Sequence, residues 1–264
     1  MTNPANEATA AAKESAPSQT LTSPDAAAAD PVGQLVAWLR QEVVGARAAG
    51  LRRPLVVGLV GLPGSGKSTL AAQLCTALGD VRALTVSLDD FYLEAPARRA
   101  RGFAHRGPPG THDLALLDAF LTQLADGATT LDVPQFDRDS ELRQPAQPRT
   151  YPAAAPLDLC LIEGWFVGAA APGYERLATA LDRLIFLDMA EESARGARLG
   201  REASRRAAGH NVMSAETVAE FWAQALAPHF ATWVKPLRRR ADVVLCLDAE
   251  HRPTALQIGK PRCP

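Results

Sequence analysis

Short apolar runs alternate with segments of helical period along this chain. Four runs are apolar on both faces and rich in Val, Leu and Ile, namely residues 55–60, 157–162, 184–187 and 243–247. A fifth run, residues 83–88, ends in a pair of aspartates. Runs of this kind are typical of parallel strands that are covered by helices on both faces. They predict a mostly parallel sheet.

Helical segments are predicted between these runs. Asp30 and Pro31 have the pattern of an N-cap followed by proline at the first helical position, and they begin a helix over residues 31–48. A second helix is expected over residues 69–78, and others lie before residue 125, around the arginines from residue 195, and from Ser214 onwards. The helix before residue 125 has the clearest apolar face, formed by Leu117, Phe120, Leu121 and Leu124. Alternating strands and helices predict an α/β architecture.

Two segments lack either period. Residues 1–30 are dominated by Ala, Ser, Thr, Pro and Asn with almost no large apolar side chain, so we expect a disordered tail. Residues 94–109 are rich in Arg, Gly and Pro, and we expect a long irregular loop there. Residues 31–264 are then predicted to form a single domain, for which the hydrophobic content of 47% provides a substantial core.

Charge and cysteine spacing exclude several classes of partner. Twenty-eight basic and 29 acidic residues give a net charge of −1, so no overall field draws the protein to nucleic acid or to an anionic membrane. No apolar stretch reaches the roughly 18 residues of a membrane span, and the amino terminus lacks a signal-peptide pattern, so we expect a cytoplasmic location. Cys75, Cys160, Cys246 and Cys263 form no CxxC pair, and we expect reduced thiols.

A glycine-rich motif joins the first apolar run to the helix that follows it. The sequence GLPGSGKS at residues 61–68 satisfies GxxxxGK[ST], the pattern of a loop whose backbone N–H groups bind phosphate. We expect Lys67 to meet the β and γ phosphates from a solvent-facing position and the Ser68 hydroxyl to bind Mg²⁺. The motif predicts ATP and Mg²⁺ as cofactors, and the alternative is a glycine turn without a ligand. The candidate nucleotide ligands are Gly61, Gly64, Ser65, Gly66, Lys67, Ser68 and Thr69.

Other signatures of nucleotide-binding proteins are absent from the sequence. The guanine-reading pattern NKxD is missing, because none of Asn3, Asn6 and Asn211 begins it. No segment resembles the LSGGQ motif of transporter ATPases, and there is no second ATPase module. These absences favour a compact kinase. Such a kinase needs a base at the acceptor hydroxyl, a carboxylate for the metal, and positive charge over the transferred phosphoryl group.

Three acidic residues follow predicted strands, at the sheet edge where α/β proteins bind ligands. Asp89 and Asp90 come after residues 83–88 and are candidates for the base, with helix capping or a turn as the alternative. Glu163 ends the run over residues 157–162, where an acidic residue can hold Mg²⁺ directly or through water. An acidic residue at the end of a strand is common, so Glu163 carries less information by itself.

One predicted helix supplies positive charge. Arg195, Arg198 and Arg201 are three residues apart and project from nearly one face, which suits a lid that closes over ATP phosphates. The alternative is a solvated helix face.

Two further groups of residues are open to more than one interpretation. His112 and Asp113 could form a catalytic pair, but Thr111 or Asp113 could instead cap the helix that follows them. Trp165 and Phe166 are expected to pack in the core rather than to stack on a substrate.

Taken together, these segments resemble the D-glycerate 3-kinases, a group within the uridine kinase, phosphoribulokinase and pantothenate kinase branch of P-loop proteins. The resemblance spans about residues 54–248. The phosphate loop is shared by many families, whereas the other motifs together are much more specific. Those motifs are SLDDFYL (residues 87–93), RG (106–107), GTHDL (110–114), PQFDR (134–138) and EGW (163–165).

The resemblance implies a P-loop fold with an arginine-bearing helical lid and transfer of the ATP γ-phosphoryl group to D-glycerate, giving 3-phosphoglycerate. It implies that Lys67 and Asp89 are catalytic, with Asp89 as the base, and that Glu163 is the Walker B acid near Mg²⁺. Arg195, Arg198 and Arg201 would belong to the lid. The residues that it places around the acceptor are Asp90, Tyr92, Arg106, His112, Asp113, Asp137 and Arg138.

The residues by themselves support a small-molecule kinase, and glycerate comes from the resemblance. The chain departs from the family in residues 95–109, which are unusually rich in Arg and Pro. A nucleoside, pantothenate or sugar-phosphate kinase is one alternative, and an ATP-hydrolysing regulator is another. No oligomeric state follows from the sequence. Candidate partners for a carboxylate are Arg98, Arg99, Arg101, Arg106 and Arg138.

Overall fold

The computed structural model describes residues 30–107, 109–210 and 212–259. Its centre is a six-stranded sheet in the order β2-β5-β1-β6-β7-β8. Neighbouring strands are parallel except for β7 and β8, so the mostly parallel sheet that the apolar runs predict is confirmed. The strands are β1 (Leu55–Gly61), β2 (Ala83–Ser87), β5 (Leu159–Glu163), β6 (Arg183–Asp188), β7 (Val243–Leu247) and β8 (Pro253–Ile258).

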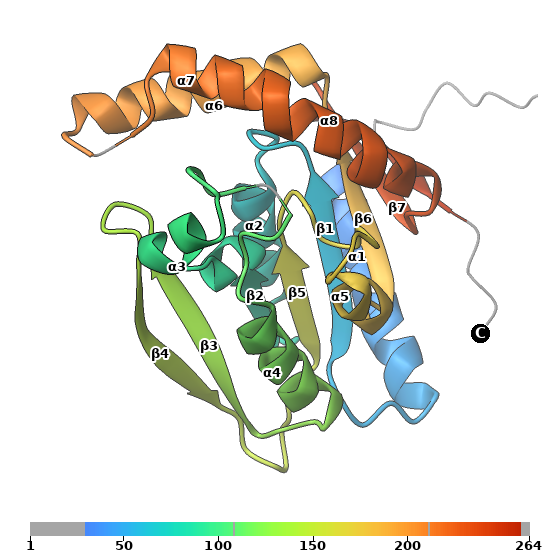
Figure 1. The fold of residues 1–264 in the computed structure, drawn as a ribbon. Helices are drawn as coiled ribbons and strands as arrows, with labels where there is room; N and C mark the ends of the chain where they lie inside the picture. The colour runs from blue at the N-terminus through green and yellow to red at the C-terminus, as the bar shows by residue number, and fades with distance from the viewer. Residues whose placement is uncertain (1–29, 108, 211, 260–264) are drawn as a thin grey trace, which may run out of the picture.

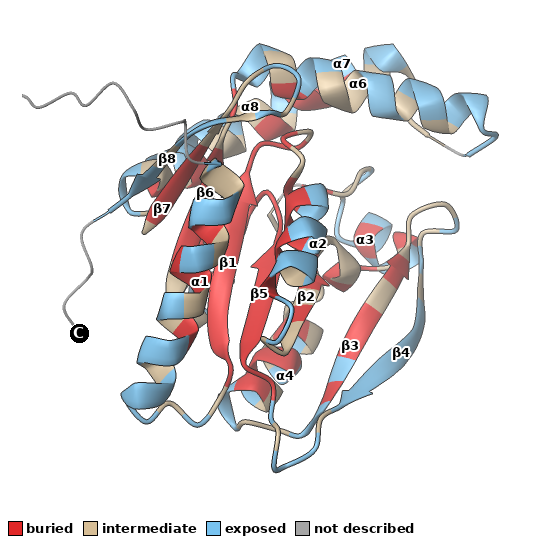
Figure 2. Ribbon diagram, turned by 180° about the vertical axis from the view of Figure 1, so that it is seen from behind, coloured by how far each residue is buried: buried red, intermediate tan, exposed pale blue. Residues whose placement is uncertain are grey.

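Helices cover both faces of the sheet, because alternate side chains of β1 point to opposite sides. Leu55, Val57 and Leu59 share a core with α1 and α2, whereas Val56 and Val60 share one with α4 and α5. Figures 1 and 2 show these layers from opposite sides. All of β1 is buried, which accounts for its continuous apolar sequence. The helices are α1 (Pro31–Ala48), α2 (Lys67–Leu78), α4 (Leu114–Ala125) and α5 (Glu175–Ala180).

Further helices lie across the carboxyl ends of the strands. The segments α6 (Glu191–Ala207) and α7 (Ala215–Phe221) run above the end of β1 (Figure 1). The helical path continues through Trp222–Leu226, α8 (Ala227–His229), Phe230–Val234 and Lys235–Arg239 to β7. Ligands of parallel α/β proteins bind at this edge of the sheet.

Most helix boundaries follow from local chemistry. Asp30 accepts hydrogen bonds from the N–H groups of Val32 and Gly33, both at 3.1 Å, and α1 begins at Pro31 as predicted. The helix α2 begins at Lys67 and not at residue 69, because the phosphate loop continues directly into its first turn. On α4 the predicted apolar face is confirmed, since Leu117, Phe120, Leu121 and Leu124 are its buried residues.

The predicted irregular loop over residues 94–109 is wrong in part, because it contains α3 (Ala95–Ala100). This helix of six residues is too short to show an apolar period. It is anchored by Arg98, whose buried side chain pairs with Glu141 at 2.9 Å. The partner lies 43 residues further along the chain, so no local pattern could indicate it.

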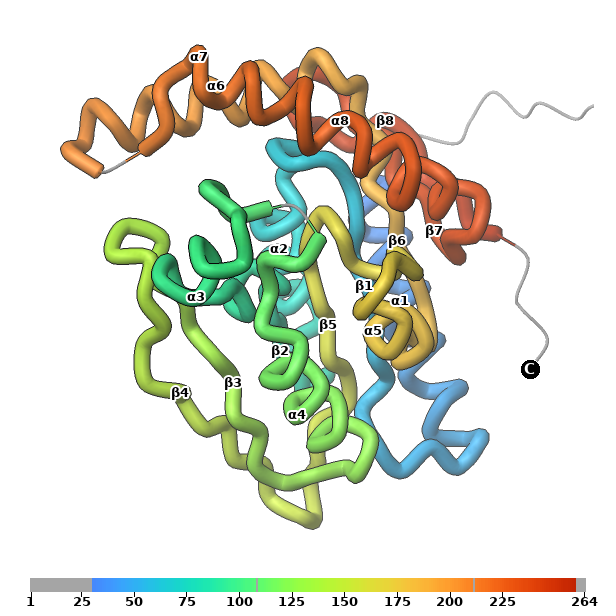
Figure 3. Tube along the Cα trace, in the orientation of Figure 1, coloured from blue at the N-terminus to red at the C-terminus, as the bar shows by residue number. Residues whose placement is uncertain are grey.

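The sequence also does not predict the hairpin of β3 (Thr130–Asp137) and β4 (Leu142–Thr150). The hairpin forms a separate two-stranded sheet beside α3 and α4 (Figure 3). Prolines weaken its strand signal, and β4 is mostly exposed, so it has no apolar run. The sequence likewise does not predict the edge strand β8, because β8 is mostly exposed and has no apolar run.

The predicted tail, residues 1–30, lies outside the described residues except for Asp30. Within the described ranges, no helix combines the length and the apolar character that crossing a bilayer requires. Cys75, Cys160 and Cys246 are free thiols, and Cys263 lies outside the described residues.

Candidate active site

The phosphate loop lies between β1, which ends at Gly61, and α2, as its motif predicts. Gly64 and Gly66 have φ angles of +97° and +83°, which favour glycine. A Cβ at Gly64 would clash with the carbonyl oxygen of Ala194 on α6, so the loop and the helix above it approach as closely as glycine allows. No described side chain caps α2, and the N–H groups of its first turn remain available for phosphate oxygens.

Lys67 is buried and does not face solvent, so that expectation is wrong. It is 8% exposed, and its Nζ donates to the carbonyl oxygen of Leu62 at 2.8 Å. Burial lowers the pKa of Lys67 to about 8, although the charges of Glu163 and Asp89 act in the opposite direction. The loop therefore encloses the ammonium group and orients it with a backbone carbonyl.

The two predicted Mg²⁺ ligands lie side by side. The Ser68 hydroxyl donates to Glu163 Oε1 at 2.9 Å. This contact forms because β1 and β5 are neighbours and Glu163 stands opposite Leu59. Mg²⁺ prefers oxygen ligands and keeps several of its waters, so a hydroxyl and a carboxylate fit it. Among the described residues, no group of three or more His, Cys, Asp or Glu side chains offers another metal centre.

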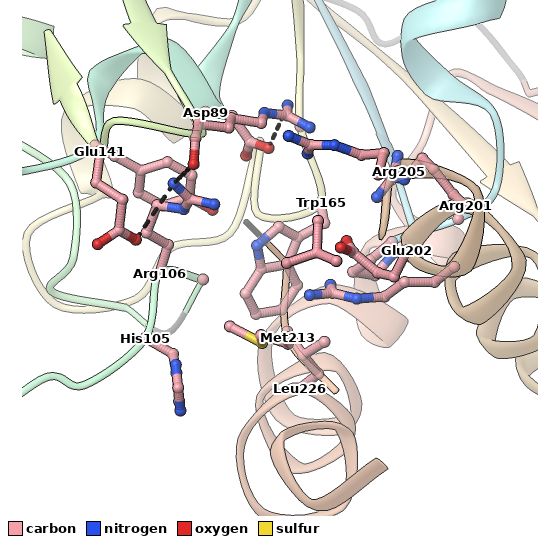
Figure 4. A pocket seen from close by; sticks show the side chains of 18 of the residues that line it. Asp89, His105, Arg106, Glu141, Trp165, Arg201, Glu202, Arg205, Met213 and Leu226 are labelled. Carbon is pink, nitrogen blue, oxygen red and sulfur yellow. Dashed lines mark hydrogen bonds and ion pairs between the residues drawn. The ribbon is translucent and has the colours of Figure 1, made fainter. Parts of the chain in front are cut away.

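A cavity of about 420 Å³ opens between the phosphate loop, the hairpin turn and the helices α6 and α7. Figure 4 shows Asp89, Arg106 and Glu141 on one side of it, and Arg201 and Arg205 on the other. Ten of the predicted site residues line this cavity: Gly64, Lys67, Ser68, Asp89, Tyr92, Arg106, Arg138, Glu163, Arg198 and Arg201.

Asp89, the candidate base, lies in the 3₁₀ turn Leu88–Phe91 that follows β2. Arg138 Nη2 donates to Asp89 Oδ2 at 2.9 Å. Burial raises the pKa of Asp89, but the charges of Arg138 and Lys67 outweigh this effect and leave the pKa below its usual value. Asp89 is therefore a carboxylate at neutral pH, as a proton acceptor must be.

Tyr92 faces the cavity, and His112 lies behind it. Their rings stack with centroids 4.4 Å apart. His112 is 1% exposed and is not among the residues that line the cavity. Its Nδ1 lies 2.6 Å from the Tyr174 hydroxyl, and burial lowers the pKa of His112 to about 4, so the imidazole is neutral at pH 7. A ligand in the cavity would therefore contact Tyr92 directly, whereas His112 supports the Tyr92 ring from behind.

Asp113 caps the helix α4, which is one of the two interpretations that the sequence left open. Its Oδ1 accepts the N–H of Leu116 at 3.1 Å at the start of α4, and its Oδ2 pairs with Arg143 at 3.0 Å. The side chain does not line the cavity. Asp113 therefore connects α4 to the hairpin rather than facing the space where an acceptor would bind.

Asp90 and Asp137 likewise do not line the cavity but organise the hairpin. Asp90 Oδ1 accepts the N–H of Phe136 at 3.2 Å, and burial raises the pKa of Asp90 to about 6 despite this bond. Asp137 accepts the N–H of Asp139 at 2.9 Å and the hydroxyl of Ser140 at 2.7 Å. Asp90 thus holds the hairpin next to the end of β2, and Asp137 shapes the hairpin's own turn.

The helix α6 brings part of its predicted arginine set to the cavity. Arg198 and Arg201 line it, whereas Arg195 is exposed and does not. Six residues along an α-helix rotate a side chain by about 120° away from the starting direction, so Arg195 and Arg201 cannot share one face. Arg205 was not among the predicted site residues but also lines the cavity. It is seven residues from Arg198, and side chains at this spacing on a helix point in directions only about 20° apart.

Arg106 and Glu141 form the cavity wall beside the hairpin, where the sequence resemblance leads us to expect the acceptor, and we call it the acceptor-side wall. Arg106 Nη1 donates to the carbonyl oxygen of Arg138 at 2.9 Å and lies 3.4 Å from Glu141. Arg98 and Arg99 also approach Glu141, at 2.9 Å and 3.8 Å. Sequence reasoning missed Glu141, because its place in the turn, at φ +56°, depends on a hairpin that the sequence does not predict.

A second cavity, of about 710 Å³, lies on the other side of the phosphate loop. The predicted nucleotide ligands Ser65, Gly66 and Thr69 line it, and Gly64 and Arg201 line both cavities. His251, in the turn between β7 and β8, donates from Nε2 to the carbonyl oxygen of the loop residue Gly64 at 2.6 Å. The phosphate loop thus separates two adjoining spaces that together could hold a nucleoside triphosphate.

Comparisons with known proteins show which family the chain resembles. The model of the phosphoribulokinase / uridine kinase family matches residues 56–250. A uridine kinase of Lactobacillus johnsonii is 26% identical over 200 residues, which cover 74% of this chain and 87% of that protein. A pantothenate kinase of Leifsonia xyli is 27% identical over 228 residues, covering 78% of this chain and 70% of that protein.

Solved structures share the fold. The D-glycerate 3-kinase of Cryptococcus neoformans superimposes with a TM-score of 0.70 at 19% identity, over 86% of this chain and 99% of that one. The phosphoribulokinase of Rhodobacter spheroides gives a TM-score of 0.52 at 14% identity, over 75% of this chain and 71% of that one. Since the family match extends from β1 through the turn that follows β7, the chain belongs to the phosphoribulokinase / uridine kinase family of P-loop kinases.

Proposed function

We propose that this kinase transfers the γ-phosphoryl group of ATP to a hydroxyl of D-glycerate and so produces 3-phosphoglycerate. The observation that carries the proposal is the positive charge on the cavity wall beside Asp89. Arg99, Arg106 and Arg138 line this side, with Glu141 among them. An acceptor that brings its own carboxylate balances this charge, and a guanidinium can bind a carboxylate through two parallel hydrogen bonds.

The fold and the motifs support the same acceptor. The motifs SLDDFYL, GTHDL and PQFDR are those on which the resemblance to D-glycerate 3-kinases rests. The fold likeness to the Cryptococcus neoformans D-glycerate 3-kinase extends over nearly all of that chain. D-glycerate is therefore favoured over uridine and pantothenate, the acceptors that the names of the sequence relatives mention.

In this proposal ATP lies across the phosphate loop, with its γ-phosphate in the first cavity and the rest of the molecule towards the second, which Ser65 lines. The Ser65 hydroxyl is buried without a hydrogen-bond partner among the described residues, at the loop where phosphate oxygens would arrive. Ser68 and Glu163 would hold Mg²⁺, which neutralises phosphate charge when it is bound.

Asp89 is placed to receive the acceptor's proton. In the transfer, the acceptor oxygen bonds to the γ-phosphorus, the bond from this phosphorus to the β–γ bridging oxygen breaks, and ADP leaves. The hydroxyl proton passes to the Asp89 carboxylate. Lys67 balances charge on the phosphates, and Arg198 and Arg201 add positive charge from α6. Because Arg138 contacts Asp89, an acceptor whose carboxylate binds Arg138 has its hydroxyl near the base.

Identification of the product tests the proposal. The protein is incubated with ATP and Mg²⁺ and with D-glycerate, uridine, pantothenate or ribulose 5-phosphate in turn, and the product is identified by ³¹P NMR. We expect 3-phosphoglycerate and poor turnover of the other three. Preferred phosphorylation of uridine or pantothenate would contradict D-glycerate as the acceptor, but it would still agree with a small-molecule kinase. Equal ATP hydrolysis with no acceptor would instead favour an ATP-hydrolysing regulator.

A further inference from the structure

Asp139 connects the two sides of the candidate active site. It lies in the turn between β3 and β4, directly after Arg138, which binds Asp89. Its Oδ1 accepts a hydrogen bond from Arg205 Nη2 at 2.5 Å, and its Oδ2 accepts one from His210 Nδ1 at 2.8 Å. Arg205 is on α6 and His210 follows that helix. One carboxylate therefore holds both the last turn of α6 and the segment after it.

The hairpin turn is built so that Asp139 can reach α6. Asp137 accepts hydrogen bonds from the N–H of Asp139 and from the hydroxyl of Ser140, which shapes the turn without using the Asp139 side chain. On either side of Asp139, Arg138 binds the candidate base and Glu141 contacts the arginines of the acceptor-side wall. Within one turn, neighbouring residues therefore bind the base, the lid helix and the acceptor-side wall.

Like charges oppose the approach of α6 to the hairpin. Burial lowers the pKa of Arg201, and repulsion from Arg138 lowers it further. Asp139 supplies negative charge where the arginines of α6 come close to the hairpin. In the part of the chain that the structure describes, no other ion pair joins α6 to β3, β4 or their turn. Asp139 is therefore the carboxylate through which the hairpin is ion-paired to α6 in these residues.

We propose that Asp139 is a positioning residue that holds the lid helix α6 to the acceptor-side hairpin and so couples the binding of ATP to the binding of the acceptor. The inference rests on the proposed function, since it needs phosphates below α6 and an acceptor beside Arg138. An acceptor that orders the hairpin also orders Arg205 through Asp139, and with it Arg198 and Arg201 above the phosphates. Each substrate then tightens the binding of the other, because coupling between two sites is reciprocal.

The contact itself is tested first, without substrates, by hydrogen–deuterium exchange of the full-length protein. Asp139→Asn removes the charge and keeps the shape of the side chain. We expect amide exchange in α6 to become about 3-fold faster or more in this variant, because a lid that has lost its contact opens more often. Equal protection of α6 in wild type and Asp139→Asn would overturn the proposal, whether or not D-glycerate is the acceptor.

Two variants serve as controls in this experiment. Asp139→Glu keeps the carboxylate and should retain the slow exchange of α6. Asp80→Asn breaks an ion pair with Arg40, at 2.6 Å, at the opposite end of α2 from the phosphate loop. It should leave the exchange of α6 unchanged, so a general loosening of the fold is distinguished from loss of the lid contact.

The coupling is then measured by calorimetry, as the dissociation constant of a non-hydrolysable ATP analogue with Mg²⁺, with and without saturating acceptor. The acceptor is D-glycerate, or whichever compound of the panel the protein phosphorylates. We expect it to lower the wild-type dissociation constant by about 5-fold or more, and by less than about 2-fold in Asp139→Asn. An equal factor in both proteins, or no coupling in the wild type, would overturn the proposal.

Discussion

At the scale of single residues, Asp89 and Glu163 have different proposed roles although both carboxylates lie at the carboxyl ends of strands. Asp89→Asn removes the proton acceptor, so kcat should fall by about 10²–10⁴-fold while ATP affinity changes little. Glu163→Gln removes a charged Mg²⁺ ligand, so the Mg²⁺ concentration for half-maximal rate should rise. A Mg²⁺ titration of both variants checks this, and a raised requirement in Asp89→Asn alone would exchange the two roles.

Lys67 should take up a proton when ATP binds above pH 8. Burial lowers its pKa to about 8 in the free protein, and phosphate charges raise the pKa again on binding. At pH 8.5 about three quarters of the free lysines are neutral, so binding should consume about 0.7 proton, and ATP affinity should fall as the pH rises through 8.

The proton uptake is measured by calorimetry of a non-hydrolysable ATP analogue in two buffers with different ionisation enthalpies. Lys67→Arg is the control, because a guanidinium stays charged and should take up no proton. Identical binding enthalpies in the two buffers for the wild type at pH 8.5 would show that Lys67 is already charged in the free protein.

Local motifs explain why some site residues can be predicted and others cannot. The phosphate loop is one contiguous sequence pattern that includes the glycines its conformation needs. Ser68, in the first turn of α2, meets Glu163 because β1, which leads into the loop, pairs with β5. The placement of Asp90 depends on a bond to Phe136, 46 residues further on. His112 is buried because Tyr92 covers it. Such contacts require the tertiary fold.

At the scale of elements, α6 provides a matched pair of arginines. Arg198 lines the cavity and Arg195, one turn earlier, is exposed. Arg198→Ala should lower kcat/KM for ATP by about 10²–10³-fold, since it removes positive charge over the transferred group. Arg195→Ala should change it by less than about 3-fold. Steady-state kinetics of both variants check the geometry of the lid, and equal losses would contradict it.

Whether the sequence predicts a helix or strand depends on how near in the chain the residues that stabilise it lie. The buried strands and α1 and α4 could be predicted, because apolar runs, helical period and a local N-cap specify them. The helix α3 could not, because its stability rests on the distant pair of Arg98 and Glu141. The hairpin could not be predicted either, because the exposed strand β4 has no apolar period and its register comes from pairing with β3.

At the scale of the whole molecule, His112 should make the fold sensitive to acid. Burial lowers its pKa to about 4, against about 6.5 in an unfolded chain. The folded state therefore binds fewer protons between these values, and stability that is fully present above pH 6.5 is lost as the pH falls towards 4. Between pH 7 and pH 5 this amounts to about 2 kcal/mol.

Urea unfolding at pH 7 and pH 5 measures this loss. The control is His112→Gln, which does not titrate and should lose about 2 kcal/mol less of its free energy of unfolding over the same interval, because all other titrating groups are shared. An equal loss in the two proteins would show that His112 does not remain neutral in the folded state at pH 5.

The charge of the acceptor is the central claim about the whole cavity. The most direct measurement is kcat/KM for acceptor-dependent ADP release with D-glycerate and with glycerol, in which a hydroxymethyl group replaces the carboxylate. If arginines of the cavity wall bind the carboxylate away from water, D-glycerate should be preferred by on the order of 10²-fold or more. A ratio near one would contradict recognition of the acceptor through its carboxylate.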